Sequence, residues 1–113
     1  MASAVGSVIA CHRSQDLDEY KDSNKLVVVD FSASWCGPCR SIAPFLADWA
    51  KRLQDVIFLK VDVDEVKDLA RQWQVEAMPT FVLLRDGKQV DRLVGAKKEE
   101  LLGKIVKHRP IKY

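Results

Sequence analysis

Two cysteines three residues apart offer the clearest chemistry in this sequence. Cys36 and Cys39 stand in the stretch 35–40, which reads Trp-Cys-Gly-Pro-Cys-Arg. Thiols at this spacing lie on neighbouring turns of one helical face, close enough to form a disulfide. A thiolate attacks other disulfides as a nucleophile, so the pair predicts a site of thiol–disulfide exchange.

The elements around this stretch would place Cys36 at the start of a helix. The apolar run 26–32 predicts a buried strand. After the cysteines, apolar residues recur on one face and predict a helix that ends near Leu53. Unpaired N–H groups and the helix dipole favour a thiolate at a helix N-terminus. We therefore expect Cys36 to be the exposed nucleophile and Cys39 to be the resolving thiol behind it.

The two residues between the cysteines suit this position. Pro38 is tolerated in the first helical turn, where its missing N–H has no intrahelical acceptor. Gly37 keeps the approach to Cys36 free of a side chain. The alternatives are a zinc site and a purely structural cross-link. We expect no metal, because the third cysteine and the two histidines do not stand at matching spacing. A bridge across three residues closes almost no loop and stabilises little.

Length and composition indicate one ordinary globular domain, 1–113, with frayed tails at 1–7 and 108–113. Lys and Arg number 18 against 16 Asp and Glu, a net charge of +2, which argues against nucleic acid as a partner. We see no secretory signal and no membrane-spanning run. Three cysteines are too few for a secreted disulfide scaffold, so we expect a reducing, intracellular compartment.

The periodicity predicts an α/β fold. The expected order is strand–helix–strand–helix–strand–helix–strand–strand–helix. Its first part suggests parallel crossover units and its second part an antiparallel hairpin. A central mixed five-stranded sheet flanked by four helices is the expected architecture. The expected strands are 8–11, 26–32, 56–62, 80–85 and 89–94, and the first and last helices are 14–23 and 97–107.

With these segments in view, the chain resembles thioredoxin over about residues 8–107. The resemblance is carried by 29–40, 58–65, 75–81 and 94–96. The segments 33–35 and 61–65, and the absence of a transit peptide, are similar to the h-type thioredoxins of the plant cytosol. The resemblance implies a thioredoxin fold and a mainly monomeric, cytoplasmic protein.

The resemblance also implies an activity. Cys36 would attack a disulfide in a target protein, and Cys39 would resolve the mixed disulfide. An NADPH-dependent thioredoxin reductase would then reduce the Cys36–Cys39 disulfide, and no bound cofactor would be needed. The rivals are a disulfide isomerase or oxidase, and a binding or chaperone-like module in which redox chemistry is incidental.

Asp30 is an acid within an apolar strand, where ionising a carboxyl group is costly and its pKa should rise. In the family, the matching acid lies behind the second cysteine and exchanges a proton with it. The other interpretation is a simple ion pair with Lys60, which matches the family's lysine on the neighbouring strand. Both can hold together.

Met78 and Pro79 precede the fourth expected strand. The resemblance implies that the bond between them is cis and that Pro79 faces the two cysteines, whereas base rates favour trans. The Met78 backbone would then be free to pair with an extended substrate segment.

A small apolar surface around Cys36 would bind the substrate, as the resemblance implies. Composition alone would place Trp35 and Met78 in the core. Gly95 suits a position where another backbone approaches closely. The residues of this surface are Trp35, Gly37, Pro38, Ala77, Met78, Val94, Gly95 and Ala96. Cys11, in the first strand, is expected to be a small, half-buried hydrophobic residue, with a regulatory thiol or an intermolecular disulfide as the alternative.

Overall fold

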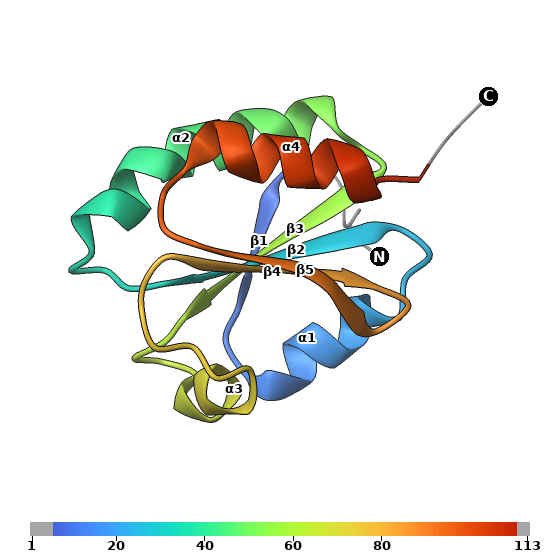
Figure 1. Cartoon of the computed structure of the whole chain (residues 1–113). Helices are drawn as coiled ribbons and strands as arrows, with labels where there is room; N and C mark the ends of the chain where they lie inside the picture. Colours follow the sequence, from blue (N-terminus) through green and yellow to red (C-terminus); the bar gives the residue numbers. More distant parts are fainter. Residues whose placement is uncertain (1–5, 111–113) are drawn as a thin grey trace.

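Helices and strands alternate as the sequence predicts in the computed structural model, which describes residues 6–110 (Figure 1). Of the tails predicted at 1–7 and 108–113, residues 1–5 and 111–113 lie outside the described residues. The elements are β1 (Val8–Cys11), α1 (Ser14–Lys21), β2 (Leu26–Ser32), α2 (Gly37–Arg52), β3 (Val56–Asp62), α3 (Lys67–Gln72), β4 (Thr80–Arg85), β5 (Lys88–Val94) and α4 (Lys98–His108).

The strands form one mixed sheet in the order β1-β3-β2-β4-β5. The pairs β1–β3 and β2–β3 are parallel, and each needs a crossover connection, which α1 and α2 supply. The pairs β2–β4 and β4–β5 are antiparallel. The predicted five-stranded mixed sheet is therefore confirmed, and β2 lies at its centre.

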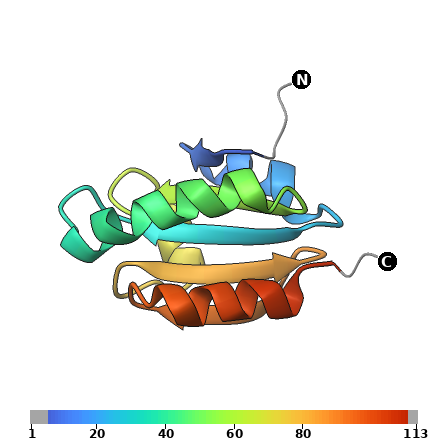
Figure 2. The same cartoon turned by 90° about the horizontal axis from the view of Figure 1, so that it is seen from above.

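Helices cover both faces of the sheet. In Figures 1 and 2, α2 and α4 lie side by side on one face, and α1 and α3 lie on the other. Side chains of β2 alternate between the two layers. Leu26 and Val28 pack towards α2 and α4, whereas Val27, Val29 and Phe31 pack towards α1 and α3. Each fully buried side chain of this kind stabilises the fold by roughly 1.5–3 kcal/mol. By the same alternation, Asp30 belongs to the face that α2 covers.

The β4–β5 hairpin turns over two residues, so β5 begins at Lys88, one residue before the predicted start. Asp86 and Gly87 have φ values of 54° and 78°. Positive φ at both central residues is the geometry of the tight turn that matches strand twist, and Asp-Gly is a preferred sequence for it. The Gly87 N–H donates to the carbonyl of Lys21 (2.9 Å), which fixes the turn against the end of α1.

The end of α4 differs from the prediction of a frayed tail from residue 108. His108 still belongs to α4, and its Nε2 lies 3.0 Å from Oδ2 of Asp91. Arg109 donates two hydrogen bonds to the buried carboxylate of Asp55, at 2.8 and 2.9 Å. The prediction is therefore wrong for these two residues, because side-chain pairing with distant parts of the chain extends the ordered end. Within residues 6–110, no helix is long and apolar enough to cross a lipid bilayer.

Candidate active site

The two cysteines of the 35–40 stretch are joined in a disulfide at the N-terminus of α2. Cys36 is the N-cap residue and Cys39 lies in the first turn, with their Cα atoms 5.3 Å apart. The Cys39 N–H donates to Sγ of Cys36 (3.2 Å). Pro38 occupies one of the first two helical positions, where no backbone hydrogen bond is lost. A negative charge on Sγ of Cys36 would therefore face an N–H donor and the positive end of the helix dipole.

Both sulfurs are largely covered in this disulfide form. Cys36 is 4% exposed and Cys39 is 2% exposed. The expectation of an exposed Cys36 is therefore wrong for the oxidised protein, because Ala33, Val63 and Met78 pack around the pair.

The loop before β4 faces Cys36. The Met78–Pro79 peptide bond is cis, as the resemblance implies. The carbonyl oxygen of Met78 lies 3.6 Å from Sγ of Cys36. Pro79 is buried, and its carbonyl accepts the Gly95 N–H at 2.8 Å. Gly95 has a φ of 106°, which only glycine adopts readily, and this conformation explains the residue type. The predicted reason, a close approach of another backbone, is wrong, because a Cβ there would contact only the Lys97 side chain at 3.6 Å.

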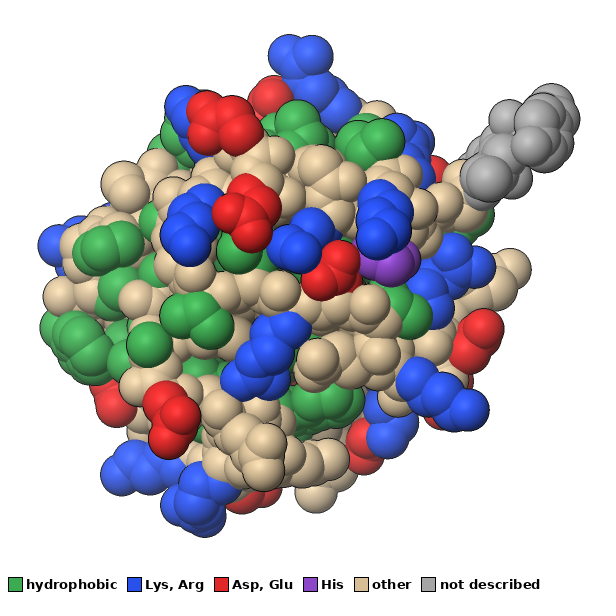
Figure 3. All heavy atoms as spheres, in the orientation of Figure 1, with side chains coloured by type: hydrophobic (Ala, Val, Ile, Leu, Met, Phe, Trp, Pro, Cys, Tyr) green, Lys and Arg blue, Asp and Glu red, His purple; other side chains and the backbone are tan. Residues whose placement is uncertain are grey.

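The residues predicted to bind substrate come from three segments, of which the loop before β4 packs on the disulfide through Met78. Trp35, Gly37, Pro38, Ala77 and Val94 are exposed, whereas Met78, Gly95 and Ala96 are half-buried. Hydrophobic side chains gather at the left edge of the space-filling view in Figure 3. Figure 1 shows that the chain enters α2 and α4 at this edge. An exposed apolar area of this kind is typical of a protein-binding surface.

Asp64 holds Trp35 in place, a contact that sequence reasoning missed. The indole of Trp35 is 64% exposed, and its Nε1–H donates to Oδ2 of Asp64 at 2.9 Å. Asp64 follows β3, in the 61–65 segment that carried the family resemblance. The family resemblance of that segment was the one sign in the sequence that Asp64 could matter. The sequence spacing between Asp64 and Trp35 did not indicate that the two side chains meet.

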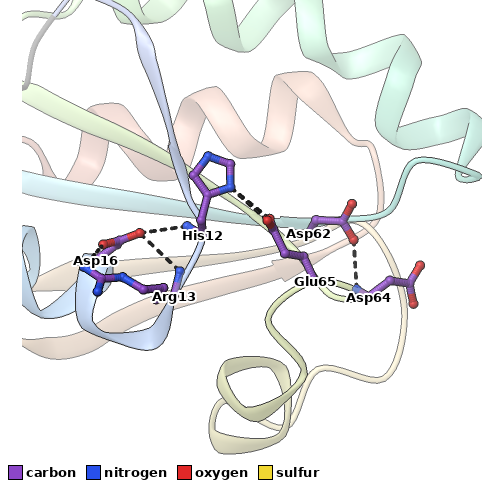
Figure 4. Close-up of polar contacts among 6 residues, drawn as sticks. All are labelled: His12, Arg13, Asp16, Asp62, Asp64 and Glu65. Atoms are coloured by element: carbon purple, nitrogen blue, oxygen red, sulfur yellow. Dashed lines mark hydrogen bonds and ion pairs between the residues drawn. The ribbon is translucent and has the colours of Figure 1, made fainter.

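The loop that carries Asp64 is itself held at two points, as Figure 4 shows. The Asp64 N–H donates to Oδ1 of Asp62 (2.8 Å). Glu65 lies beside His12, with Oε2 3.0 Å from Nδ1. His12 directly follows β1 and had no predicted role. These contacts tie the loop after β3 to the segment after β1 and limit the positions open to Asp64.

Asp30 is a buried acid, 3% exposed, on the sheet face that α2 covers. Its Oδ1 has no hydrogen-bond partner among the described residues. Burial raises the pKa of this carboxyl group to about 7, and the positive charge of Lys60 lowers it by less than burial raises it. Lys60 is the register partner of Asp30 on β3. Lys60 also lines a hollow of about 250 Å³, together with Ser32, Ala33, Ser34, Arg40 and Asp62.

Cys11 does not belong to this constellation. It is 1% exposed and packs on the sheet face covered by α1 and α3, without a disulfide partner. Burial, with smaller contributions from Asp16 and Glu19, raises the pKa of this thiol to about 11, so it stays protonated. The interpretation as a small hydrophobic residue is confirmed, although the residue is buried and not half-buried. No group of three or more potential ligands among residues 6–110 could hold a metal ion.

Comparison with known proteins agrees with this geometry. The thioredoxin family model matches residues 8–108. Thioredoxin H-type 1 of Nicotiana tabacum is 61% identical over 111 residues, which cover 95% of this chain and 88% of the relative. Thioredoxin H1 of Arabidopsis thaliana is 57% identical, covering 96% and 98%. The crystal structure of thioredoxin NaTrxh from Nicotiana alata superposes with a TM-score of 0.88 at 48% identity, covering 97% and 99%.

Proposed function

This chain belongs to the thioredoxin family, and from that premise we propose which of its residues carry out dithiol–disulfide exchange. Thioredoxins are disulfide oxidoreductases that act on disulfide-containing target proteins and are recycled by a reductase. They carry no cofactor, because the redox group is the cysteine pair of the chain itself.

In the reduced protein, Cys36 is the nucleophile. Its thiolate attacks one sulfur of the client disulfide, so a Cys36–client bond forms while the client S–S bond breaks and the second client sulfur leaves as a thiolate. The N-cap position supports this role, because the N–H of Cys39 points at Sγ of Cys36. The carbonyl of Met78, 3.6 Å away, is a ready acceptor for the same sulfur when it carries a proton.

Cys39 completes the exchange with Asp30 as its proton acceptor. Once deprotonated, Cys39 attacks Sγ of Cys36, the Cys36–client bond breaks, and the Cys36–Cys39 disulfide forms. Two electrons pass to the client, and the two thiol protons end on the client's two thiols. A base for this step needs a pKa near the working pH. Asp30 meets that need, since burial raises its pKa to about 7, and Lys60 stabilises its charged form.

Client recognition relies on the apolar surface and on the backbone before β4. The Met78 backbone pairs with an extended client segment beside Cys36, a short form of strand addition. Gly37, Pro38 and Pro79 border the path by which the client segment reaches Cys36. They keep that path narrow and free of charged side chains. The flanking contacts come from Trp35, Ala77, Val94, Gly95 and Ala96.

The recycling partner, the oligomeric state and the location are inferred from the likeness to the h-type relatives. We propose recycling by an NADPH-dependent thioredoxin reductase, a mainly monomeric state and a cytosolic location. A single domain over 1–113 and a net charge of +2 fit a protein with neither nucleic acid nor membrane as partner.

The observations that carry this function are the disulfide at the start of α2 and, on the sheet face that this helix covers, a buried acid without a hydrogen-bond partner at Oδ1. The test is to use Cys39→Ser protein as bait for disulfide-containing proteins. Mixed disulfides should accumulate on Cys36 and should be absent from the Cys36→Ser control. A Cys11→Ser/Cys39→Ser control should trap clients as well as Cys39→Ser does, and equal adducts on Cys11 and Cys36 would show that the roles are wrong. Full biological activity in a Cys36→Ser/Cys39→Ser variant would favour the chaperone-like alternative.

A further inference from the structure

A groove of about 270 Å³ lies between the second and third turns of α2 and the start of α4. Both helices begin at the same edge of the molecule, as Figures 1 and 2 show. The groove is lined by Ser41, Ile42 and Phe45 from α2 and by Ala96, Lys98 and Glu99 from the start of α4. Apart from Ala96, none of these side chains belongs to the exchange site or to the client-binding surface described above.

The groove adjoins segments that flank the disulfide site. Ser41 donates its Oγ–H to the carbonyl of Pro38 (2.9 Å), directly beyond the cysteine pair. Ala96 follows Gly95, whose N–H is bonded to the carbonyl of Pro79. A polypeptide bound across Cys36 that leaves between these two loops would enter the groove.

The floor of the groove is apolar, with Phe45, whereas its rim is charged, with Lys98 and Glu99. Phe45 remains 38% exposed, although a phenylalanine on an amphipathic helix is usually covered. The ammonium of Lys98 lies 4.0 Å from the centre of its ring. No carboxylate among residues 6–110 forms an ion pair with Lys98. An apolar ring with an unneutralised positive charge above it favours a partner with an apolar side chain next to an acidic one.

We propose that the groove is a specificity subsite for client proteins. It binds the client segment that flanks the reactive cystine, with an apolar side chain against Phe45 and a neighbouring carboxylate on Lys98. Glu99, on the same rim, opposes the carboxylate and penalises acidic segments that bind farther along α4. The inference rests on the proposed function, because it deepens the client recognition of the same site.

The test measures kcat/KM for fluorescent disulfide peptides that differ only beside the cysteine, where they carry Phe-Glu, Phe-Lys or Ser-Gln. Lys98→Glu should lower kcat/KM for the Phe-Glu peptide by about fivefold, and the loss should shrink at high salt. The Phe-Lys peptide should gain, and Phe45→Ala should slow both Phe peptides. Glu99→Gln should speed the Phe-Glu peptide. Bis(2-hydroxyethyl) disulfide, too small to reach the groove, should be reduced at unchanged rates.

Lys107→Glu is the matched control, since it makes the same change of charge at the other end of α4, away from the groove, and should leave the rates for all three peptides close to those of the unaltered protein. Equal effects of Lys98→Glu on every peptide would overturn the proposal. So would slower recycling by the reductase with unchanged peptide rates, which would assign the groove to the reductase. If the unaltered protein reduced neither peptides nor the small disulfide, the proposed function itself would fail, which is a different result.

Discussion

Asp30 and Lys60 are register partners on adjacent strands, yet one is buried and the other is exposed. Lys60 keeps its ammonium in water, so it compensates only part of the cost of burying the carboxylate. The balance leaves the pKa of Asp30 at about 7. Near neutral pH this carboxyl group is therefore close to half ionised, which is the condition for taking up and releasing a proton in turn.

Replacing Asp30 should make the stability of the oxidised protein less dependent on pH. The folded state holds the Asp30 proton more tightly than the unfolded chain does, because its pKa rises from 3.8 to about 7. Its contribution to the free energy of unfolding is thus intact below pH 3.8 and is lost as the pH rises through 7. Asp30→Asn should be more stable than the parent by up to about 4 kcal/mol at pH 8.5 and nearly equal to it at pH 4. Urea unfolding at several pH values measures this, and a difference independent of pH would contradict it.

Removing the neighbouring charge should move the same pKa upwards. Lys60→Gln deletes the positive charge that lowers the pKa of Asp30, so less than half of the carboxyl groups should be ionised at pH 7. A carboxyl titration followed by NMR checks this, with Lys88→Gln as a control of equal charge change at an exposed position at the start of β5. If both variants moved the pKa equally, the effect would come from net charge and not from the pairing.

The sequence predicted the elements better than it predicted the contacts between them. The burial of Asp30 could be predicted because it lies within an apolar strand, and the Cys36–Cys39 pair because both thiols belong to one helical turn. The approach of the Met78–Pro79 segment to Cys36, seen at the Met78 carbonyl, came only from the family resemblance, since residues some 40 positions apart leave no periodic signal. The bond from Trp35 to Asp64 and the pairing of Arg109 with Asp55 went unpredicted for the same reason.

The pair at the end of α4 should contribute measurably to stability. Asp55 is 5% exposed and accepts two hydrogen bonds from Arg109. Arg109→Ala leaves a buried charge with fewer partners and should lower the free energy of unfolding by about 1–3 kcal/mol. The control is Arg52→Ala, which removes an exposed pair with Asp48 and should change stability by no more than about 0.5 kcal/mol. Chemical denaturation measures the free energy of unfolding of both variants. Equal losses would show that the buried pair stabilises the fold no more than the exposed pair does.

Two glycines should respond to alanine in opposite directions. Gly87 has a φ of 78°, and a Cβ there would lie 2.5 Å from Oδ1 of Asp22. The Asp22 side chain can move aside, so the backbone strain is the main cost, and Gly87→Ala should destabilise the fold by about 1–2 kcal/mol. Gly103 lies in α4 with open space around its Cα, so Gly103→Ala should stabilise by about 0.5–1 kcal/mol. Thermal unfolding of both variants decides the signs, and a shift of the same sign in both would contradict this account.

Freeing the indole of Trp35 should weaken the binding of protein clients without changing the chemistry. Asp64→Ala removes the acceptor of the Nε1–H bond, so the exposed ring loses its fixed orientation beside Cys36. A lost hydrogen bond of about 0.5–1.5 kcal/mol corresponds to a rise in KM of roughly two- to tenfold for insulin, a protein disulfide substrate. Asp64→Asn keeps an oxygen acceptor and should stay close to the parent protein. Reduction of bis(2-hydroxyethyl) disulfide should be the same in all three proteins, because that molecule is too small to need the ring. A parallel loss towards the small disulfide would mean that Asp64 acts on the cysteines themselves and not through Trp35.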